Sequence, residues 1–184
     1  MTTMSRPVLF ALLLASAVPA WALDCSGDGW LDGACRRVGQ VWNDGQGEVY
    51  LPGYAYHLRS AYRREKINSF NEQAWGFGLG RGLVDDDGDW HGLYAMAFLD
   101  SHNDPEPIAG YAYQSRHHFS ENWQGGLGFT AFLTSRSDTL HHFPVPGVLP
   151  LASVQYKRLA VMGTYIPGGK GNGNVVFLFA RYGF

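Results

Sequence analysis

The chain alternates between apolar and polar residues in short runs, which clusters of Gly, Asp, Asn and Pro separate. Alternation with a period of two is typical of β-strands with one apolar face, and the clusters are typical of turns. Eight runs follow this pattern: 48–62, 75–84, 90–98, 108–117, 123–134, 149–156, 159–167 and 174–184. We therefore predict an all-β protein with eight strands, an arrangement typical of small closed barrels.

The last run indicates which solvent the barrel faces. In NVVFLFARYGF, one face carries Val176, Leu178, Ala180, Tyr182 and Phe184. An outward apolar band that ends in an aromatic girdle is typical of bacterial outer-membrane strands. The alternative is a soluble lipocalin-like barrel, which would turn polar residues outward. Because similar apolar faces recur in other runs, we predict an eight-stranded antiparallel transmembrane β-barrel.

The first residues predict export. Arg6 precedes the apolar run VLFALLLASAV, and Ala20-Trp21-Ala22 has the small-x-small pattern of a signal peptidase site. The run is shorter than the ~20 apolar residues of a membrane helix. We therefore expect a signal peptide over residues 1–22, rather than an uncleaved anchor, and a single barrel domain over residues 23–184.

The charge of the chain excludes one class of partner. The chain has 14 Lys and Arg residues and 16 Asp and Glu residues. Cleavage after Ala22 removes Arg6 and no acidic residue, which changes the net charge from −2 to −3. Nucleic-acid binding requires a basic surface, so we expect no nucleic-acid partner.

A short helix is expected before the first strand. Trp30, Ala34, Val38 and Trp42 recur at helical spacing, which predicts an amphipathic helix over about 30–42 that lies at the membrane interface.

Cys25 and Cys35 are the only cysteines, and an even number in an exported chain indicates a disulfide. Residues ten apart on one continuous helix lie ~15 Å apart, beyond the ~7 Å limit between bonded Cα atoms. A bond therefore requires the chain to fold back at Gly27 and Gly29.

The reversal FLDSHNDPEPIAG, residues 98–110, carries more reactive groups than a turn requires. Asp100 and Ser101 precede Asn103 and Pro105, which are residue types that reverse a chain. One interpretation is a solvated hairpin loop, since surface loops are generally polar. The other is that the carboxylate and the hydroxyl belong to a site.

No nucleotide or metal motif accompanies this segment. GFGLGRG, residues 76–82, fits G-x-G-x-x-G loosely, but no helical or βαβ pattern follows it. Neither H-E-x-x-H nor G-x-S-x-G occurs. We therefore expect no cofactor and no metal.

Five long strings resemble strings of the PagP family, which are lipid A palmitoyltransferases. They are DWHGLYAMAFLDS (89–101), EPIAGYAY (106–113), GLGFTAFLTSR (126–136), VLPLASVQY (148–156) and MGTYIPGGKGNGNVVF (162–177). The resemblance extends from about Trp42 to Phe184. It implies an eight-stranded outer-membrane barrel with an N-terminal amphipathic helix, which the residue pattern also predicts.

The resemblance also implies a reaction. A monomeric enzyme in the outer membrane of a Gram-negative bacterium would move a palmitoyl chain from the sn-1 position of a glycerophospholipid donor. The acceptor would be a hydroxyl on an acyl chain of lipid A. The alternatives are a non-catalytic lipid-binding barrel and a structural outer-membrane barrel.

The residues that match the family's functional positions are His57, in the string YHLRSAY, and Asp100 and Ser101, in MAFLDS. Acyl transfer from an ester to an alcohol requires a base, a group that orients the base, and donors for the oxyanion. We assign His57 as the base and Asp100 as its orienting group. Ser101 is either a nucleophile or an oxyanion donor.

The resemblance implies two further features of the substrate path. Proline cannot donate to a strand ladder, and the family opens two lateral seams with paired prolines. Pro150 and Pro167 match one seam, whereas Pro52 matches half of the other, where Ala74 replaces the second proline. The family has a Gly at the floor of its acyl pocket, and this chain has Ala112 there. A methyl group at a tightly packed floor predicts either a preference for donors slightly shorter than palmitoyl or a compensating change elsewhere on the floor.

Overall fold

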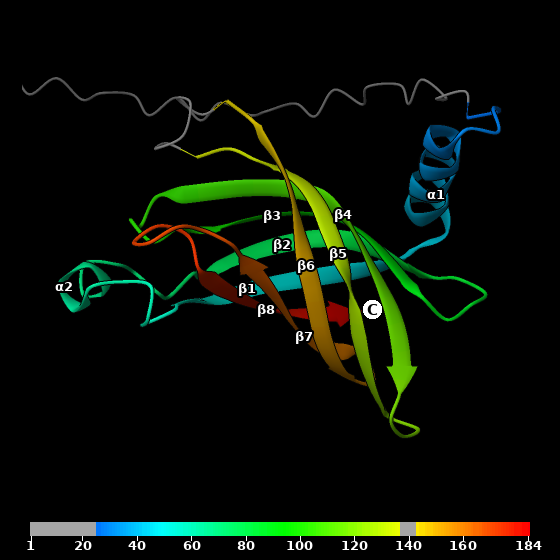
Figure 1. Cartoon of the computed structure of the whole chain (residues 1–184). Helices are drawn as coiled ribbons and strands as arrows, with labels where there is room; N and C mark the ends of the chain where they lie inside the picture. Colours follow the sequence, from blue (N-terminus) through cyan, green and yellow to red (C-terminus); the bar gives the residue numbers. More distant parts are fainter. Residues whose placement is uncertain (1–24, 137–142) are drawn as a thin grey trace, which may run out of the picture.

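The computed structural model describes residues 25–136 and 143–184, which form a closed barrel of eight antiparallel strands with a helix before the first strand (Figure 1). The helices and strands are α1 (Trp30–Asp44), β1 (Gln46–His57), α2 (Arg64–Ile67), β2 (Gly76–Val84), β3 (Trp90–Leu99), β4 (Pro105–His118), β5 (Trp123–Thr134), β6 (Val145–Tyr156), β7 (Leu159–Ile166) and β8 (Val175–Gly183). The fold class predicted from the sequence is confirmed. The expected signal peptide, residues 1–22, lies outside the described residues.

The first strand is shorter than its sequence pattern predicts. The alternating run continues to Tyr62, but β1 ends at His57. Leu58 still donates its N–H to the carbonyl of Asn174, the residue before β8, and the chain then turns away because Ala61 donates its N–H to the carbonyl of Leu58. The short helix α2, which the sequence did not predict, follows this turn. Figure 1 shows α1 and α2 at opposite ends of the barrel.

Two ladders of the barrel wall stop before they reach the end that carries α2. The β1–β2 ladder ends at the pair Tyr50 and Gly78, although β1 continues alongside β8. The β6–β7 ladder ends at the pair Leu151 and Thr164, although β6 begins six residues earlier, at Val145.

Prolines stand where these ladders stop. Pro52 lies at a register shift in the β1–β8 ladder, and Pro150 directly precedes the last paired residue of β6. Neither proline has an N–H to donate. The Thr164 hydroxyl instead donates to the Pro150 carbonyl over 2.7 Å.

The outer face of the barrel is apolar and the inner face is mixed. Large apolar side chains point outward and are more than a third exposed; they include Leu51, Phe77, Leu79, Leu127, Phe129, Leu133, Val148, Val161, Leu178 and Tyr182. The inward side chains form one buried cluster: Tyr50, Ala74, Trp90, Tyr94, Met96, Ala112, Leu151, Ala160, Met162, Phe177 and Phe179. In the described part of the chain, neither helix has the length and apolar character that a membrane-spanning helix needs.

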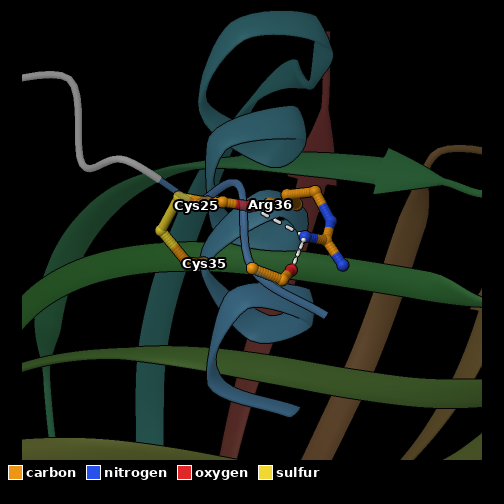
Figure 2. Close-up of a disulfide and its surroundings, with 4 residues drawn as sticks. Cys25, Cys35 and Arg36 are labelled. Carbon is orange, nitrogen blue, oxygen red and sulfur yellow. Dashed lines mark hydrogen bonds between the residues drawn. A yellow bond between two sulfur atoms is a disulfide. The ribbon is translucent and has the colours of Figure 1, made fainter. Parts of the chain in front are cut away.

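The segment before α1 folds back onto the helix, as a disulfide requires. Cys25 and Cys35 are bonded, with their Cα atoms 5.8 Å apart (Figure 2). Arg36 holds the returning segment, because its Nη1 donates to the carbonyls of Cys25 (2.8 Å) and Gly27 (2.7 Å). The chain enters α1 from an extended Gly29. The predicted disulfide and the predicted fold-back are both confirmed.

Candidate active site

The three residues expected to act in catalysis line one cavity inside the barrel. His57 is the last residue of β1, and Asp100 and Ser101 follow β3. The cavity extends from these residues along the barrel interior, and most of its lining is apolar. Its wall includes Met96, Phe98, Ile108, Phe132, Leu151 and Phe177. The structure therefore gathers polar groups at one end of a long apolar space.

The imidazole of His57 is fixed by hydrogen bonding and by stacking. His57 is only 3% exposed, and its Nδ1 lies 3.2 Å from Oε1 of Glu72. The same carboxylate oxygen accepts the backbone N–H of His57 over 3.0 Å. The ring of Phe70 stacks on the imidazole with a centroid distance of 4.5 Å and an interplanar angle of 24°. Because Glu72 engages Nδ1, Nε2 is the ring nitrogen left for a substrate proton.

Glu72 remains ionised over a wide pH range. Its partial burial works against the charge, but hydrogen bonds from Arg59, from the backbone and imidazole of His57 and from Tyr54 outweigh burial and lower the pKa of Glu72 to about 2. Arg59 binds both carboxylate oxygens, at 2.8 and 2.6 Å, and Tyr54 donates its hydroxyl at 2.8 Å. A fixed anion therefore lies beside the imidazole of His57.

In the structure, the partner of His57 is Glu72 rather than Asp100, which the sequence interpretation had placed there. Oδ1 of Asp100 accepts the backbone N–H groups of His102 (2.8 Å) and Asp104 (2.9 Å) within its own turn. Oδ2 lies 3.5 Å from Nη2 of Arg136. The short side chain of Asp100 thus binds the turn in which it lies, which fixes the backbone on both sides of Ser101.

One segment of the loop before β2 joins the two halves of the site. Phe70 stacks on His57, Glu72 binds its Nδ1, and between them Asn71 donates its N–H to the carbonyl of Ser101 over 2.9 Å. The Ser101 side chain lines the cavity, and its hydroxyl forms no hydrogen bond with residues 25–136 or 143–184. The base and the hydroxyl are therefore positioned by the same three consecutive residues.

A cation lies at the same end of the cavity. Arg136 is the second residue after β5, and its side chain lines the cavity. Its Nη1 lies 3.1 Å from Oε2 of Glu106. Arg136 and Glu72 are the residues that sequence reasoning did not identify. Arg136 ends a string that resembles the PagP family, which was a usable signal. Glu72 lies in a loop 15 residues after His57, and no periodicity or motif marks it.

The opposite end of the cavity is closed by side chains that include Ala112. This residue is 2% exposed and lines the cavity together with Tyr50, Trp90 and Met162. Gln114, on the same face of β4, is also buried. The inward orientation that alternation predicted for Ala112 is confirmed.

The prolines assigned to the two seams lie beside the ends of two ladders. Pro150 and Pro167 flank the β6–β7 gap, since β7 ends at Ile166. Pro52 flanks the β1–β2 gap, which is present although Ala74 stands where the second proline was expected. Ala74 is 2% exposed and lines the cavity. Two interruptions of the wall therefore lie alongside the cavity.

Comparisons with known proteins agree with this architecture. The family described as "Antimicrobial peptide resistance and lipid A acylation protein PagP" matches residues 37–181. A protein of Bordetella bronchiseptica named lipid A acyltransferase PagP is 54% identical over 185 residues, which cover 100% of both chains. Proteins of the same name are 44% identical in Legionella pneumophila, over 95% of this chain and 94% of that protein, and in Methylobacillus flagellatus, over 84% of each. The chain therefore belongs to the PagP family.

Proposed function

We propose that this chain is an outer-membrane acyltransferase that moves a palmitoyl or similar chain from the sn-1 position of a glycerophospholipid to a hydroxyl of lipid A. One observation carries the proposal: a Glu72–His57 pair and the Ser101 hydroxyl lie at the polar end of a long apolar cavity. Full-length relatives named lipid A acyltransferase support the reaction class and the acceptor. The exposed apolar belt of the barrel supports an outer-membrane location.

The proposed reaction uses His57 as the general base. The acceptor hydroxyl oxygen attacks the sn-1 ester carbonyl while its proton moves to Nε2 of His57. The ionised Glu72 holds the imidazole through Nδ1 and stabilises the imidazolium that forms. When the tetrahedral intermediate collapses, the sn-1 oxygen leaves with the proton from Nε2. The products are an acylated lipid A and a lysophospholipid.

Ser101 has two possible roles in this scheme. As an oxyanion donor, its hydroxyl would hydrogen-bond the carbonyl oxygen as negative charge develops on that oxygen. As a nucleophile, it would take the acyl chain first and pass it to lipid A in a second step. The position of Ser101 on the cavity wall suits both roles, and Asp100 supports either one by holding the turn. Arg136 places a positive charge where lipid phosphates would approach.

The interruptions of the wall offer a route for the acyl chains. Donor and acceptor chains lie in the bilayer, whereas a complete ladder would seal the barrel interior from lipid. We propose that chains pass through the gap flanked by Pro150 and Pro167 and the gap flanked by Pro52. The donor chain then descends toward Ala112, which closes the acyl pocket in this proposal.

Two measurements test the function. Mass spectrometry of lipid A from a host that lacks this activity should show one added acyl chain when the protein is produced. The purified barrel in detergent should transfer an isotope-labelled sn-1 chain to lipid A and release an equal amount of lysophospholipid. Hydrolysis without transfer, or an unmodified lipid A beside a correctly folded barrel, would favour a non-catalytic lipid-binding or structural role.

Two substitutions assign the activity to this site. His57→Ala and Ser101→Ala should each abolish transfer or reduce it severely, while the barrel retains its heat-modifiable migration on gels. The matched control is His118→Ala, since His118 is exposed at the opposite end of the barrel. Equal loss of folding and activity in the two site variants would indicate a structural role instead.

A further inference from the structure

The apolar cavity and a second, polar cavity are separated by a thin layer of side chains. The second cavity has a volume of about 250 Å³ and lies at the end of the barrel where β1 begins and β8 ends. Its lining includes Glu48, Arg116, Gln155, Lys157 and Arg181. Trp90 lines both cavities. The Trp90 ring therefore borders open space on its polar side, and the polar contacts on that side help to hold it in place.

A single carboxylate holds the layer. Glu48 accepts the Tyr50 hydroxyl on Oε2 over 2.6 Å and the indole N–H of Trp90 on Oε1 over 3.1 Å. Tyr50 and Trp90 are 1% and 2% exposed, and both rings line the apolar cavity. The two rings that close the cavity thus have their polar ends attached to the same side chain beneath them.

Arg181 fixes this carboxylate in turn. Its Nη1 pairs with Oε1 of Glu48, and its Nη2 donates to Oε1 of Gln155. The guanidinium carbon lies 4.4 Å from the centroid of the Trp90 ring, so the cation also contacts the closing layer directly. Glu48 and Arg181 are 4% and 5% exposed. A buried carboxylate requires such a partner, because an unpaired charge in this position would be costly.

Glycines bring the backbone close to this network. A Cβ atom on Gly82 would lie 2.1 Å from Oε1 of Glu48, and one on Gly92 would lie 2.4 Å from the indole ring of Trp90. A Cβ on Gly80 would lie 2.8 Å from the ring of Tyr50. A side chain at any of these three glycines would therefore displace the network, and the glycines leave the space that the network occupies.

We infer that Glu48, paired with Arg181, is a specificity-determining positioning residue. It holds Tyr50 and Trp90 in place at the closed end of the apolar cavity and so fixes how far an acyl chain descends. This inference rests on the proposed acyl transfer and deepens it. Without the anchor, the Trp90 ring can move toward the polar cavity that it lines, and the Tyr50 hydroxyl loses its acceptor. The acyl space then becomes deeper and less sharply bounded.

The test compares acyl-chain selection in matched variants. Purified protein is given an equimolar mixture of phospholipids whose sn-1 chains increase by two carbons from lauroyl to stearoyl. One methylene beyond a pocket's limit costs roughly 10-fold or more in rate, so the wild type should show a sharp cut-off. In Glu48→Gln, the discrimination against the next longer chain should fall by about 5-fold or more. Tyr50→Phe, which keeps the ring and the ion pair, should weaken the cut-off to a smaller extent.

Ser153→Ala is the control variant. Ser153 lies at a similar depth on β6 and donates its hydroxyl to Gln114, but it lines neither cavity. Its chain-length profile should match the wild type. If Glu48→Gln does not fold, Tyr50→Phe decides the matter, since it leaves every charge in place. An unchanged cut-off in the folded variants, or complete loss of transfer at all chain lengths, would overturn the inference.

A second readout does not depend on turnover. Lysophospholipids of the same chain lengths are titrated into the detergent-solubilised barrel, and the increase in unfolding temperature is measured for each. The stabilisation should stop increasing at a shorter chain in the wild type and in Ser153→Ala than in Glu48→Gln. A wild type that binds chains with this limit but transfers none would refute the proposed function and leave the role of Glu48 supported. Identical limits in all proteins would refute that role.

Discussion

The Glu72→Gln substitution tests whether the base depends on the carboxylate found at its Nδ1. Gln has nearly the same shape as Glu but carries no charge, so the imidazolium formed during transfer loses its anionic partner. A hydrogen bond to a charged group contributes about 1.5 to 3 kcal/mol, which corresponds to a rate loss of roughly 10-fold to 150-fold. Stacking on Phe70 still restrains the ring, so we expect a loss in the lower part of this range.

The assay measures initial rates of labelled acyl transfer for the wild type, Glu72→Gln and Glu65→Gln. Glu65 is exposed in α2 and serves as the control for a lost negative charge in the same loop region. The Glu65 variant should retain the wild-type rate. A Glu72→Gln enzyme with the wild-type rate would refute the orienting role. A variant that does not fold would show that Glu72 acts on the loop structure rather than on the chemistry.

The same substitution has a consequence for acid stability. The pKa of Glu72 falls from an ordinary 4.5 to about 2 in the folded protein. A lowered pKa means that the ionised group stabilises the fold above pH 4.5, and that this contribution is lost as the pH falls from 4.5 through 2. Wild-type unfolding temperatures should therefore decline more steeply across this interval than those of Glu72→Gln. Parallel declines would show that the carboxylate is not held as the structure indicates.

Asp100→Asn should cause a smaller, measurable loss of transfer rate, because the amide oxygen can still accept the turn N–H groups but loses the charge beside Arg136; an unchanged rate would remove the Asp100 charge from the mechanism. Ala112→Gly should move the preferred sn-1 chain to a greater length in the mixed-donor assay, since one methylene changes binding by about 1 to 3 kcal/mol. Identical profiles would show that Ala112 does not limit the pocket. Intact-mass measurement after alkylation without reductant should show no label on Cys25 or Cys35, and two labels would contradict the disulfide.

The barrel was predictable because its signal is periodic and repeated. Each strand alternates apolar and polar residues over enough positions that it is identified even when its ends are misplaced. In β1, the run to Tyr62 predicted the strand but not its end at His57. The strand ends where the chain turns, since Ala61 donates its N–H to the carbonyl of Leu58, and the last contact before that turn is with Asn174, far along the chain. Alternation cannot reveal such contacts, because they join segments that are distant in sequence.

The site was predictable only in part, for the same physical reason. His57, Asp100 and Ser101 were identified by strings that resemble one family, and all three line the cavity. The role assigned to Asp100 did not match the structure, because the sequence does not show that its carboxylate reaches its own turn before it can reach the imidazole. Glu72 approaches His57 through a loop whose path depends on tertiary contacts.

The pairing of β8 with β1 has a consequence for biogenesis. β1 and β8 close the barrel by pairing with each other, and they are the first and the last strand along the chain. The wall therefore cannot become continuous before the last strand is available. Until that moment two strand edges carry unsatisfied N–H and C=O groups, which are prone to pair with other chains and costly in a bilayer. The loop closed by Cys25 and Cys35 is local and can mature earlier, independently of insertion. Oxidation of the N-terminal segment and sealing of the wall should therefore be separable steps, and a chain truncated before β8 should aggregate although its disulfide is intact.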